Sequence, residues 1–361
     1  MLVDADYMDR AIFLAERGRG RTSPNPLVGA VVVAADDVIV GQGFHERAGG
    51  PHAEVNALEQ AGPRARGATL YCTLEPCCHT GRTGPCVHRI VDAGVRRVVA
   101  AIADPNPLVN GKGFEYLRSR GVAVDIGVGD RAALVLNQPF FTWMRERRPF
   151  VILKAATSAD GYLAEAPGRR TTLTSAPANR HAHRVRAEVD AIGVGVGTIV
   201  VDDPQLTARG AYRERPLTRV IFDRRLRTPP EAHVLSTGDR GPVIIVTTAD
   251  GASREAERRT LEARGARVVV AGDSTLRAAL DCLARAEIGS LLVEGGAALH
   301  AAAWDEQLVD VVRLYVTPRI IGPGGIPFLA GRDFSSAALF ERRVETLGPD
   351  LLVEGYVHRP R

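Results

Sequence analysis

Four residues in the first quarter of the chain could bind a metal ion and move a proton. His52 stands two residues before Glu54, and Cys77 and Cys86 follow further along the chain. An imidazole and two thiolates are ligands that zinc prefers, and three protein ligands leave a fourth position for water. Zinc lowers the pKa of bound water from about 15.7 to roughly 7, and Glu54 would pass the released proton to a leaving amine. The spacing therefore predicts a hydrolytic zinc site.

A closed, purely structural zinc site is the alternative interpretation. Cys78 or His79 could supply a fourth protein ligand. Glu54 argues against a closed site, because its spacing from His52 suits proton transfer and serves no purpose where water has no access to the metal.

The cysteine spacing departs from the pattern of deaminases that act on nucleobases, H-x-E followed by P-C-x-x-C. A proline precedes Cys77, but residue 80 is a threonine and the next usable cysteine is Cys86. The string TLEPCCHTGRTGPC that ends at Cys86, together with HAEV at residues 52–55, resembles the bifunctional deaminase/reductase family of riboflavin biosynthesis.

The resemblance implies a zinc-dependent deaminase that acts on a pyrimidinone carrying a ribosylamino phosphate and removes its exocyclic 2-amino group. It assigns zinc to His52, Cys77 and Cys86 and the proton shuttle to Glu54. Its substrate contacts fall on Asn25, His45, His79 and Arg82. From the residues themselves, Asn25 could equally be a turn asparagine between two prolines, and His79 or Arg82 a solvated loop residue.

Composition bounds the class of protein. The chain has 361 residues, 45% of them hydrophobic and 24% charged, which fits two globular domains. A net charge of +4 without a basic run, and 5% aromatic residues, favour a small phosphorylated substrate over nucleic acid. Four of the five cysteines crowd together, which favours metal over disulfides. With no signal peptide or transmembrane run evident, we expect a cytoplasmic protein with no membrane partner. We also expect it to form a homo-oligomer.

Strands that alternate with helices predict an α/β layered domain over the first 146 residues, ending at a charged stretch around residues 145–149. The resemblance implies that this domain has the three-layer fold of cytidine deaminases. A helix over residues 53–61 would place His52 and Glu54 at its first turn, and Pro76 and Cys77 would open another helical turn. We expect helices over residues 6–17, 86–93, 111–120 and 131–144, and strands over 27–34, 38–43, 70–74, 97–101 and 122–126.

Residues 147–361 predict a second α/β domain. We expect strands over residues 150–156, 191–194, 219–222, 243–247, 267–270, 291–293, 311–316 and 351–358, with helices over 175–188, 253–264, 274–286 and 297–307. The glycines at 193, 195 and 197 follow a strand and could cradle phosphates, although Thr198 stands where G-x-G-x-x-G needs a glycine.

Several short stretches of this half together resemble the reductase of the same family, which has a dihydrofolate-reductase-like fold. They include Lys154, residues 158–161, residues 202–209 and residues 293–296. The resemblance implies hydride transfer from NADPH to C1′ of the substrate's ribose, with Lys154 supplying charge or a proton. From the residues themselves, Lys154 could instead be a surface lysine at a strand end. The resemblance places NADPH against Ala156, Thr198, Asp202, Gly295, Gly296 and Ala297, and the substrate against Arg186, Leu206, Arg209 and Glu294.

The reductase half departs from the family pattern at one place. Many relatives carry a tryptophan followed by Ile-Thr-Ser where this chain has Thr172-Leu173-Thr174-Ser175, so a flat contact to cofactor or substrate is missing. The alternatives to the bifunctional enzyme are a zinc deaminase of a related pyrimidine with a weak or inactive reductase half, a nucleic-acid base deaminase, and a non-catalytic zinc-stabilised binding protein. The long cysteine spacing disfavours the nucleic-acid deaminase.

Overall fold

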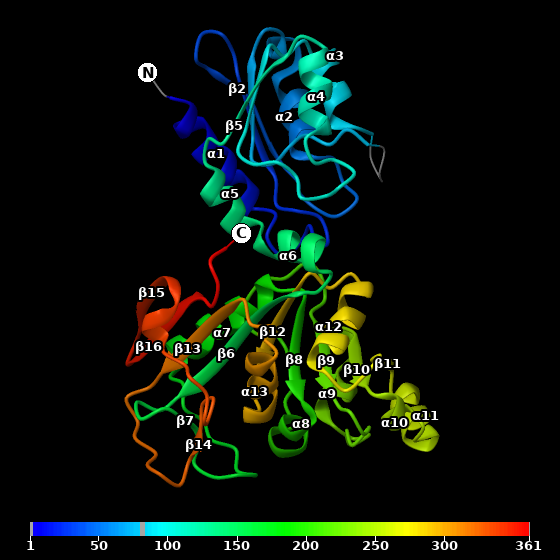
Figure 1. Cartoon of the computed structure of the whole chain (residues 1–361), viewed down its shortest axis with the longest axis vertical. Helices are drawn as coiled ribbons and strands as arrows, with labels where there is room; N and C mark the ends of the chain where they lie inside the picture. The colour runs from blue at the N-terminus through cyan, green and yellow to red at the C-terminus, as the bar shows by residue number, and fades with distance from the viewer. Residues whose placement is uncertain (1–2, 80–83, 361) are drawn as a thin grey trace. The chain divides into compact units, whose positions relative to one another are not determined.

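The computed structural model describes residues 3–79 and 84–360 (Figure 1). Contacts within the chain define two compact units. The first ends at Glu146 and takes in Pro360, and the second is Arg147–Arg359. Among the described residues, no helix is both long enough and apolar enough to cross a membrane.

The first unit is built on a five-stranded sheet in the order β2-β1-β3-β4-β5. β1 is antiparallel to both β2 and β3, whereas β3, β4 and β5 run parallel. The strands are β1 (Gly29–Val33), β2 (Ile39–Phe44), β3 (Thr69–Cys72), β4 (Arg97–Ala100) and β5 (Ala123–Ile126). All five residues of β1 are buried, as expected for a central strand covered on both faces.

Helices cover both faces of this sheet and confirm the predicted three-layer domain (Figure 1). α2 (Ala53–Ala61), α3 (Cys86–Asp92) and α4 (Lys112–Ser119) pack on one face through Ala57, Ile90 and Leu117. α1 (Asp4–Glu16) and α5 (Asp130–Leu136) pack on the other through Met8 and Ala133. A short 3-10 turn, η1 (Gly62–Ala65), follows α2, and α6 (Gln138–Glu146) follows α5.

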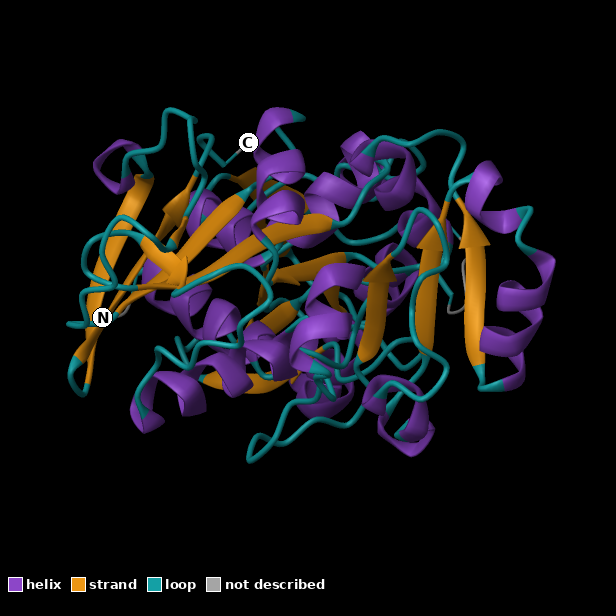
Figure 2. Ribbon diagram, turned by 90° about the horizontal axis from the view of Figure 1, so that it is seen from below, coloured by secondary structure: helices purple, strands orange, loops and turns teal. Residues whose placement is uncertain are grey.

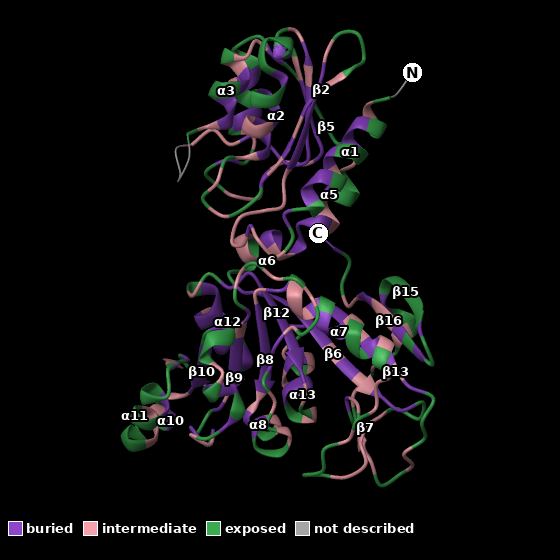
Figure 3. Ribbon diagram, turned by 180° about the vertical axis from the view of Figure 1, so that it is seen from behind, coloured by how far each residue is buried: buried purple, intermediate pink, exposed green. Residues whose placement is uncertain are grey.

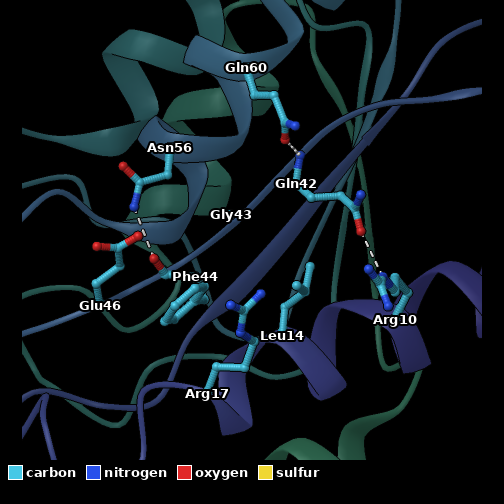
Figure 4. A pocket seen from close by; sticks show the side chains of 9 residues that line it. All are labelled: Arg10, Leu14, Arg17, Gln42, Gly43, Phe44, Glu46, Asn56 and Gln60. Atoms are coloured by element: carbon cyan, nitrogen blue, oxygen red, sulfur yellow. Dashed lines mark hydrogen bonds between the residues drawn. The ribbon is translucent and has the colours of Figure 1, made fainter.

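Two glycines bring α2 directly onto the edge strand β2. A Cβ at Gly41 would lie 2.1 Å from the carbonyl oxygen of Ala57, and one at Gly43 would lie 2.5 Å from that of Ala53. Figure 4 shows two α2 side chains that cap this edge: Asn56 Nδ2 donates to the Phe44 carbonyl at 2.9 Å, and the Gln42 N–H donates to Gln60 Oε1 at 2.6 Å. A hollow of about 230 Å³ lies beside them. This packing fixes the helix whose first turn carries the predicted proton shuttle.

Two local predictions in the first unit are wrong. Pro76 and Cys77 open no helical turn, because the Cys77 carbonyl instead accepts a hydrogen bond from the Val87 N–H at 3.2 Å. The helix predicted over residues 131–144 is split into α5 and α6 at Asn137. The Asn137 amide there pairs with both backbone groups of Leu27, at 2.8 and 2.9 Å, a tertiary bond that the helical pattern does not reveal.

The second unit contains a nine-stranded sheet in the order β11-β10-β9-β8-β12-β6-β13-β16-β15. Its strands are parallel except β16, which is antiparallel to both of its neighbours. The strands are β6 (Phe150–Thr157), β8 (Ala191–Gly195), β9 (Thr218–Phe222), β10 (Val243–Thr247), β11 (Ala266–Val270), β12 (Ser290–Glu294), β13 (Val311–Val316), β15 (Phe340–Leu347) and β16 (Asp350–Tyr356). A separate two-stranded ribbon joins β7 (Tyr162–Ala164) to β14 (Ile326–Pro327).

Helices flank the large sheet on both sides (Figure 2), and its central strands are buried (Figure 3). α12 (Leu276–Arg285) and α13 (Ala297–Asp305) share one core with β6 and β12. The opposite core takes residues from α7 (Ala176–Glu188), α8 (Val196–Asp202), α9 (His233–Ser236) and α11 (Glu255–Ala263). The remaining short elements are α10 (Ala249–Ala252), η2 (Gly238–Arg240) and η3 (Ser336–Ala338).

The predicted phosphate-cradling glycine loop does not form. β8 runs to Gly195 and α8 begins at Val196, so no loop separates them. Gly193 is a packing glycine, since a Cβ there would lie 2.8 Å from the Phe222 ring. β15 is a strand that the sequence did not predict; seven of its eight residues are exposed, so it lacks the apolar alternation that marks a half-buried strand.

Candidate active sites

His52, Cys77 and Cys86 converge in the first unit from three different elements. His52 caps the N-terminus of α2, Cys77 lies in the loop after β3, and Cys86 opens α3. Their ligand atoms all lie within 4.8 Å of one another. His52 Nδ1 is 3.2 Å from Cys86 Sγ and 3.5 Å from Cys77 Sγ. Ideal tetrahedral zinc bonds place a nitrogen and a sulfur ligand about 3.6 Å apart, so this donor set fits zinc.

The local electrostatics prepare Cys77 for metal binding. The Cys86 side chain, together with His52 and the Cys86 backbone N–H at 3.3 Å, holds the pKa of the Cys77 thiol down at about 4. Hydrogen bonding to Cys77 in turn raises the pKa of His52 to about 9. The thiolate is the form that ligates metals. All five cysteines of the chain are described and free of disulfide bonds.

Glu54 lies in the first turn of α2 and is 3% exposed. Burial raises the pKa of its carboxyl, although His52 opposes the shift. A raised pKa makes the carboxylate a better proton acceptor than an exposed one, which suits a general acid/base.

Asn25 and His45 lie beside the His52 ring. The His45 and His52 ring centroids are 5.4 Å apart, and Asn25 Nδ2 is 3.1 Å from His45 Nε2. His45 Nδ1 donates to the Pro51 carbonyl at 3.0 Å, so in the neutral ring Nε2 accepts from the Asn25 amide. Burial lowers the pKa of His45 and favours this neutral form.

His79 is half-buried, and its Nδ1 makes no hydrogen bond within the described part of the chain. The predicted substrate residue Arg82 lies outside the described residues. Asp104 was not predicted as a site residue. It is buried, and burial, with contributions from Glu75, Cys77 and Glu54, raises the pKa of its carboxyl to about 7. The sequence could have indicated Asp104 by its position just after the parallel strand β4, because ligand-binding residues often follow such strands.

Three predicted residues of the second unit form a buried charged cluster. Glu294 lies opposite Lys154 where β12 pairs with β6. Its carboxylate takes two hydrogen bonds from Arg186, at 2.8 Å each, and lies 3.6 Å from Lys154 Nζ. Burial raises the pKa of Glu294, but Lys154 and Arg186 outweigh it and lower the pKa to about 2. Glu294 is therefore ionised at neutral pH.

Aromatic groups that the sequence did not single out surround this cluster. Lys154 Nζ lies 5.3 Å from the centroid of the Tyr315 ring, and the Tyr315 hydroxyl is 2.8 Å from His181 Nδ1. His300 is 1% exposed, and neither of its ring nitrogens has a hydrogen-bond partner among the described residues. Periodicity marked Tyr315 and His300 only as members of a strand and a helix.

Four of the predicted cofactor-binding residues lie next to one another at the turn between β12 and α13. Gly295 and Gly296 adopt positive φ of 68° and 89°, and Ala297 opens α13 directly after them. A Cβ at Gly295 would lie 3.1 Å from Thr198 Oγ1, so Thr198 borders this turn. Ala156, on β6, is in register with Tyr315, and Asp202 ends α8 half-buried.

The predicted phosphate residues of the second unit differ in exposure. Nε and Nη2 of Arg186 donate to Glu294, and Nη1 donates to the Thr207 carbonyl at 3.0 Å. Arg209 is exposed, and Leu206 is buried with a positive φ of 54°.

Comparisons with known proteins cover nearly the whole chain. Residues 1–102 match the cytidine and deoxycytidylate deaminase zinc-binding region, and residues 149–353 match the RibD C-terminal domain. The riboflavin biosynthesis protein RibD of Aquifex aeolicus is 43% identical over 97% of this chain and 98% of its own length. The chain belongs to the RibD family.

Other RibD proteins agree over the full length. The RibD of Escherichia coli is 37% identical over 96% of this chain and 98% of its own. The RibD structure from Acinetobacter baumannii, form 1, has a TM-score of 0.87 at 36% identity and covers 98% of this chain and 99% of its own. A Thermotoga maritima structure described as diaminohydroxyphosphoribosylaminopyrimidine deaminase and 5-amino-6-(5-phosphoribosylamino)uracil reductase has a TM-score of 0.83 at 34% identity, covering 97% of each chain.

RibD membership confirms the predictions of family and enzyme class. The chain is a deaminase and reductase of riboflavin biosynthesis, with a unit that carries the cytidine deaminase zinc-binding region followed by an α/β unit that matches the RibD C-terminal domain. His52, Cys77 and Cys86 form the zinc set of the deaminase unit. The reductase half implies a nicotinamide cofactor.

Proposed function

We propose that this chain catalyses two consecutive reactions. Residues 1–146 deaminate 2,5-diamino-6-ribosylamino-4(3H)-pyrimidinone 5′-phosphate, and residues 147–361 reduce the product, 5-amino-6-(5-phosphoribosylamino)uracil, with NADPH. The observation that carries the proposal is the convergence of His52, Cys77 and Cys86 beside the buried Glu54. The two activities named for the Thermotoga maritima structure support the choice of substrates.

In the deaminase unit, Glu54 is the proton carrier. When bound, zinc supplies an activated water. Glu54 takes the proton of this water and gives it to the exocyclic amine, which leaves as ammonia while the ring carbon gains the oxygen. Asn25 and the neutral His45 hold the pyrimidine, and His79 and Arg82 hold the phosphate. The raised pKa of the Glu54 carboxyl supports this role.

In the reductase unit, the buried charges orient the opening sugar. When bound, NADPH supplies the hydride that reaches C1′. Lys154 protonates the ring oxygen that is released, and Glu294 holds Lys154 in place at 3.6 Å. Arg209, with the N–H groups of Arg186 that neither Glu294 nor the Thr207 carbonyl uses, binds the phosphate, and Leu206 completes the pocket.

The cofactor contacts complete the proposal. NADPH lies against Ala156, Thr198 and Asp202, with its pyrophosphate at the turn formed by Gly295, Gly296 and Ala297. The two positive-φ glycines leave room for a phosphate to approach the backbone. Cytoplasmic location and homo-oligomeric assembly remain part of the proposal, and light scattering of the purified chain tests the assembly.

A coupled assay tests the two reactions. Ammonia release and NADPH absorbance are followed together from the diamine substrate, with and without a zinc chelator, and again from the deaminated intermediate. From the diamine we expect ammonia release followed by NADPH oxidation, with both lost on chelation. From the deaminated intermediate we expect NADPH oxidation alone, unaffected by the chelator. Ammonia without NADPH oxidation would favour the weak reductase implied by Thr172, and no ammonia at all would overturn the proposal.

A further inference from the structure

We propose that Glu75 is a positioning residue of the zinc site, whose carboxylate holds the Cys77 loop against a segment far along the chain. Glu75 stands two residues before Cys77 and is 3% exposed. Residues 73–79 belong to no helix or strand, so bonds to other segments must fix them. The inference rests on the zinc ligands and requires no particular substrate.

Both carboxylate oxygens of Glu75 accept hydrogen bonds from backbone N–H groups. Oε2 accepts from Asp104 at 3.2 Å and from Gly111 at 2.9 Å, and Oε1 accepts from Gly113 at 2.9 Å. Hydrogen bonds to an ionised acceptor are stronger than those between neutral groups. The Glu75 N–H also donates to the Ile102 carbonyl at 3.0 Å. One side chain thus gathers the backbone of residues 104–113 around the residue that leads into the zinc loop.

Packing leaves the loop no alternative position on this side. A Cβ at Gly113 would lie 2.2 Å from the Pro76 carbonyl oxygen, so the backbone of α4 rests directly on the residue between Glu75 and Cys77. On the other side, the Cys86 N–H donates to Cys77 Sγ at 3.3 Å. The Cys77 sulfur is therefore fixed between the Glu75 contacts and the start of α3.

The same bonds position a second group of the site. The Asp104 N–H is anchored on Glu75, and the Asp104 carboxyl is buried. A shift of Glu75 would thus displace both the loop that carries a zinc ligand and the segment that carries this buried carboxyl. A residue that only stabilised the fold would leave the metal geometry unchanged once the chain had folded.

The test is Glu75→Gln in the full-length chain, with Glu115→Gln, an exposed residue of α4, as the matched control. Glutamine has one acceptor oxygen, so one or two of the three N–H groups would face an amide nitrogen that cannot accept. Transfer of zinc to a chromogenic chelator and the visible spectrum of the cobalt-substituted chain are measured. We expect zinc release at least tenfold faster and a changed cobalt spectrum in Glu75→Gln, with wild-type values in Glu115→Gln.

Reductase activity measured from the deaminated intermediate shows whether the second unit has folded. Thermal unfolding shows whether the first unit has folded. A folded Glu75→Gln chain with wild-type zinc release and cobalt spectrum would overturn the proposal. If Glu75→Gln does not fold, Gly113→Ala decides, because its methyl displaces Pro76 without changing a charge. Faster zinc release in that variant supports the proposal, and wild-type release overturns it. Loss of folding in both variants would assign Glu75 to stability alone and also overturn it. None of these readouts requires the proposed substrate.

Discussion

Arg186 and Glu294 meet edge to edge in the second unit, with Nε donating to Oε1 and Nη2 to Oε2 at 2.8 Å each. The two residues come from α7 and from the end of β12, and Lys154 approaches the same carboxylate from β6. One buried anion thus holds two cations, so that removing it leaves both uncompensated.

Glu294→Gln should weaken both the fold and the reaction of the second unit. We expect its free energy of unfolding to fall by about 3 kcal/mol at pH 7, because two buried cations lose their anion. Since the pKa of Glu294 is lowered from 4.5 to about 2, the difference from wild type should be full above pH 4.5 and disappear as pH falls toward 2. NADPH oxidation from the deaminated intermediate should slow at least tenfold. Glu255→Gln, on the exposed surface of α11, is the control, and equal rates in both variants would contradict the role of Glu294.

Glu54→Gln should abolish deamination and leave zinc in place. The amide cannot carry a proton, so we expect ammonia release to fall by roughly 10³-fold, within the range of general acid/base contributions. Metal analysis should still find one zinc per chain, and reduction of the deaminated intermediate should be unchanged. Glu59→Gln, exposed on the same helix, should keep wild-type ammonia release. A Glu54→Gln chain that still released ammonia at the wild-type rate would show that another group moves the proton.

His300 should make the second unit sensitive to acid. Burial, aided by the charge of Lys154, lowers the pKa of His300 from 6.5 to about 4. The unfolded chain therefore takes up this proton before the folded one, and stability is lost as pH falls from 6.5 toward 4, by up to about 3 kcal/mol. In His300→Leu this loss should be absent. Urea unfolding from pH 4.5 to 7.5, followed by Trp304 fluorescence in a Trp143→Phe background, measures it.

The exposed His358 provides the control for this pH dependence. His358→Leu should retain the wild-type loss of stability toward acid. Stability curves of wild type and His300→Leu that run parallel across the whole range would contradict the assignment.

Asn137→Ala should destabilise the first unit. Its buried amide pairs with the N–H and carbonyl of Leu27 at 2.8 and 2.9 Å, and the alanine would leave both groups without these partners. We expect the free energy of unfolding to fall by about 2 kcal/mol. The KM for deamination should also rise, because Leu27 follows Asn25 by two residues. Unfolding followed by Trp143 fluorescence in a Trp304→Phe background measures the loss, and the exposed Asn110→Ala should show none.

The sequence by itself determined the elements that carry the zinc site. The predicted helix over residues 53–61 matches α2, and the cysteine that begins the next helix opens α3 as expected. These features are local: a helix start fixes how His52 and Glu54 are presented, and the spacing of the ligands was sufficient to indicate the metal. The strands of the second unit were likewise predicted where apolar runs are buried, as in β10 and β13.

The tertiary structure alone decided which side chains meet. Glu75 binds backbone groups 29, 36 and 38 residues away, and Arg186 reaches Glu294 across 108 residues. Such partners depend on which strands become neighbours and in what register, and local propensity and periodicity do not specify either. The break at Asn137 has the same cause, because a long-range amide contact overrides a continuous helical pattern.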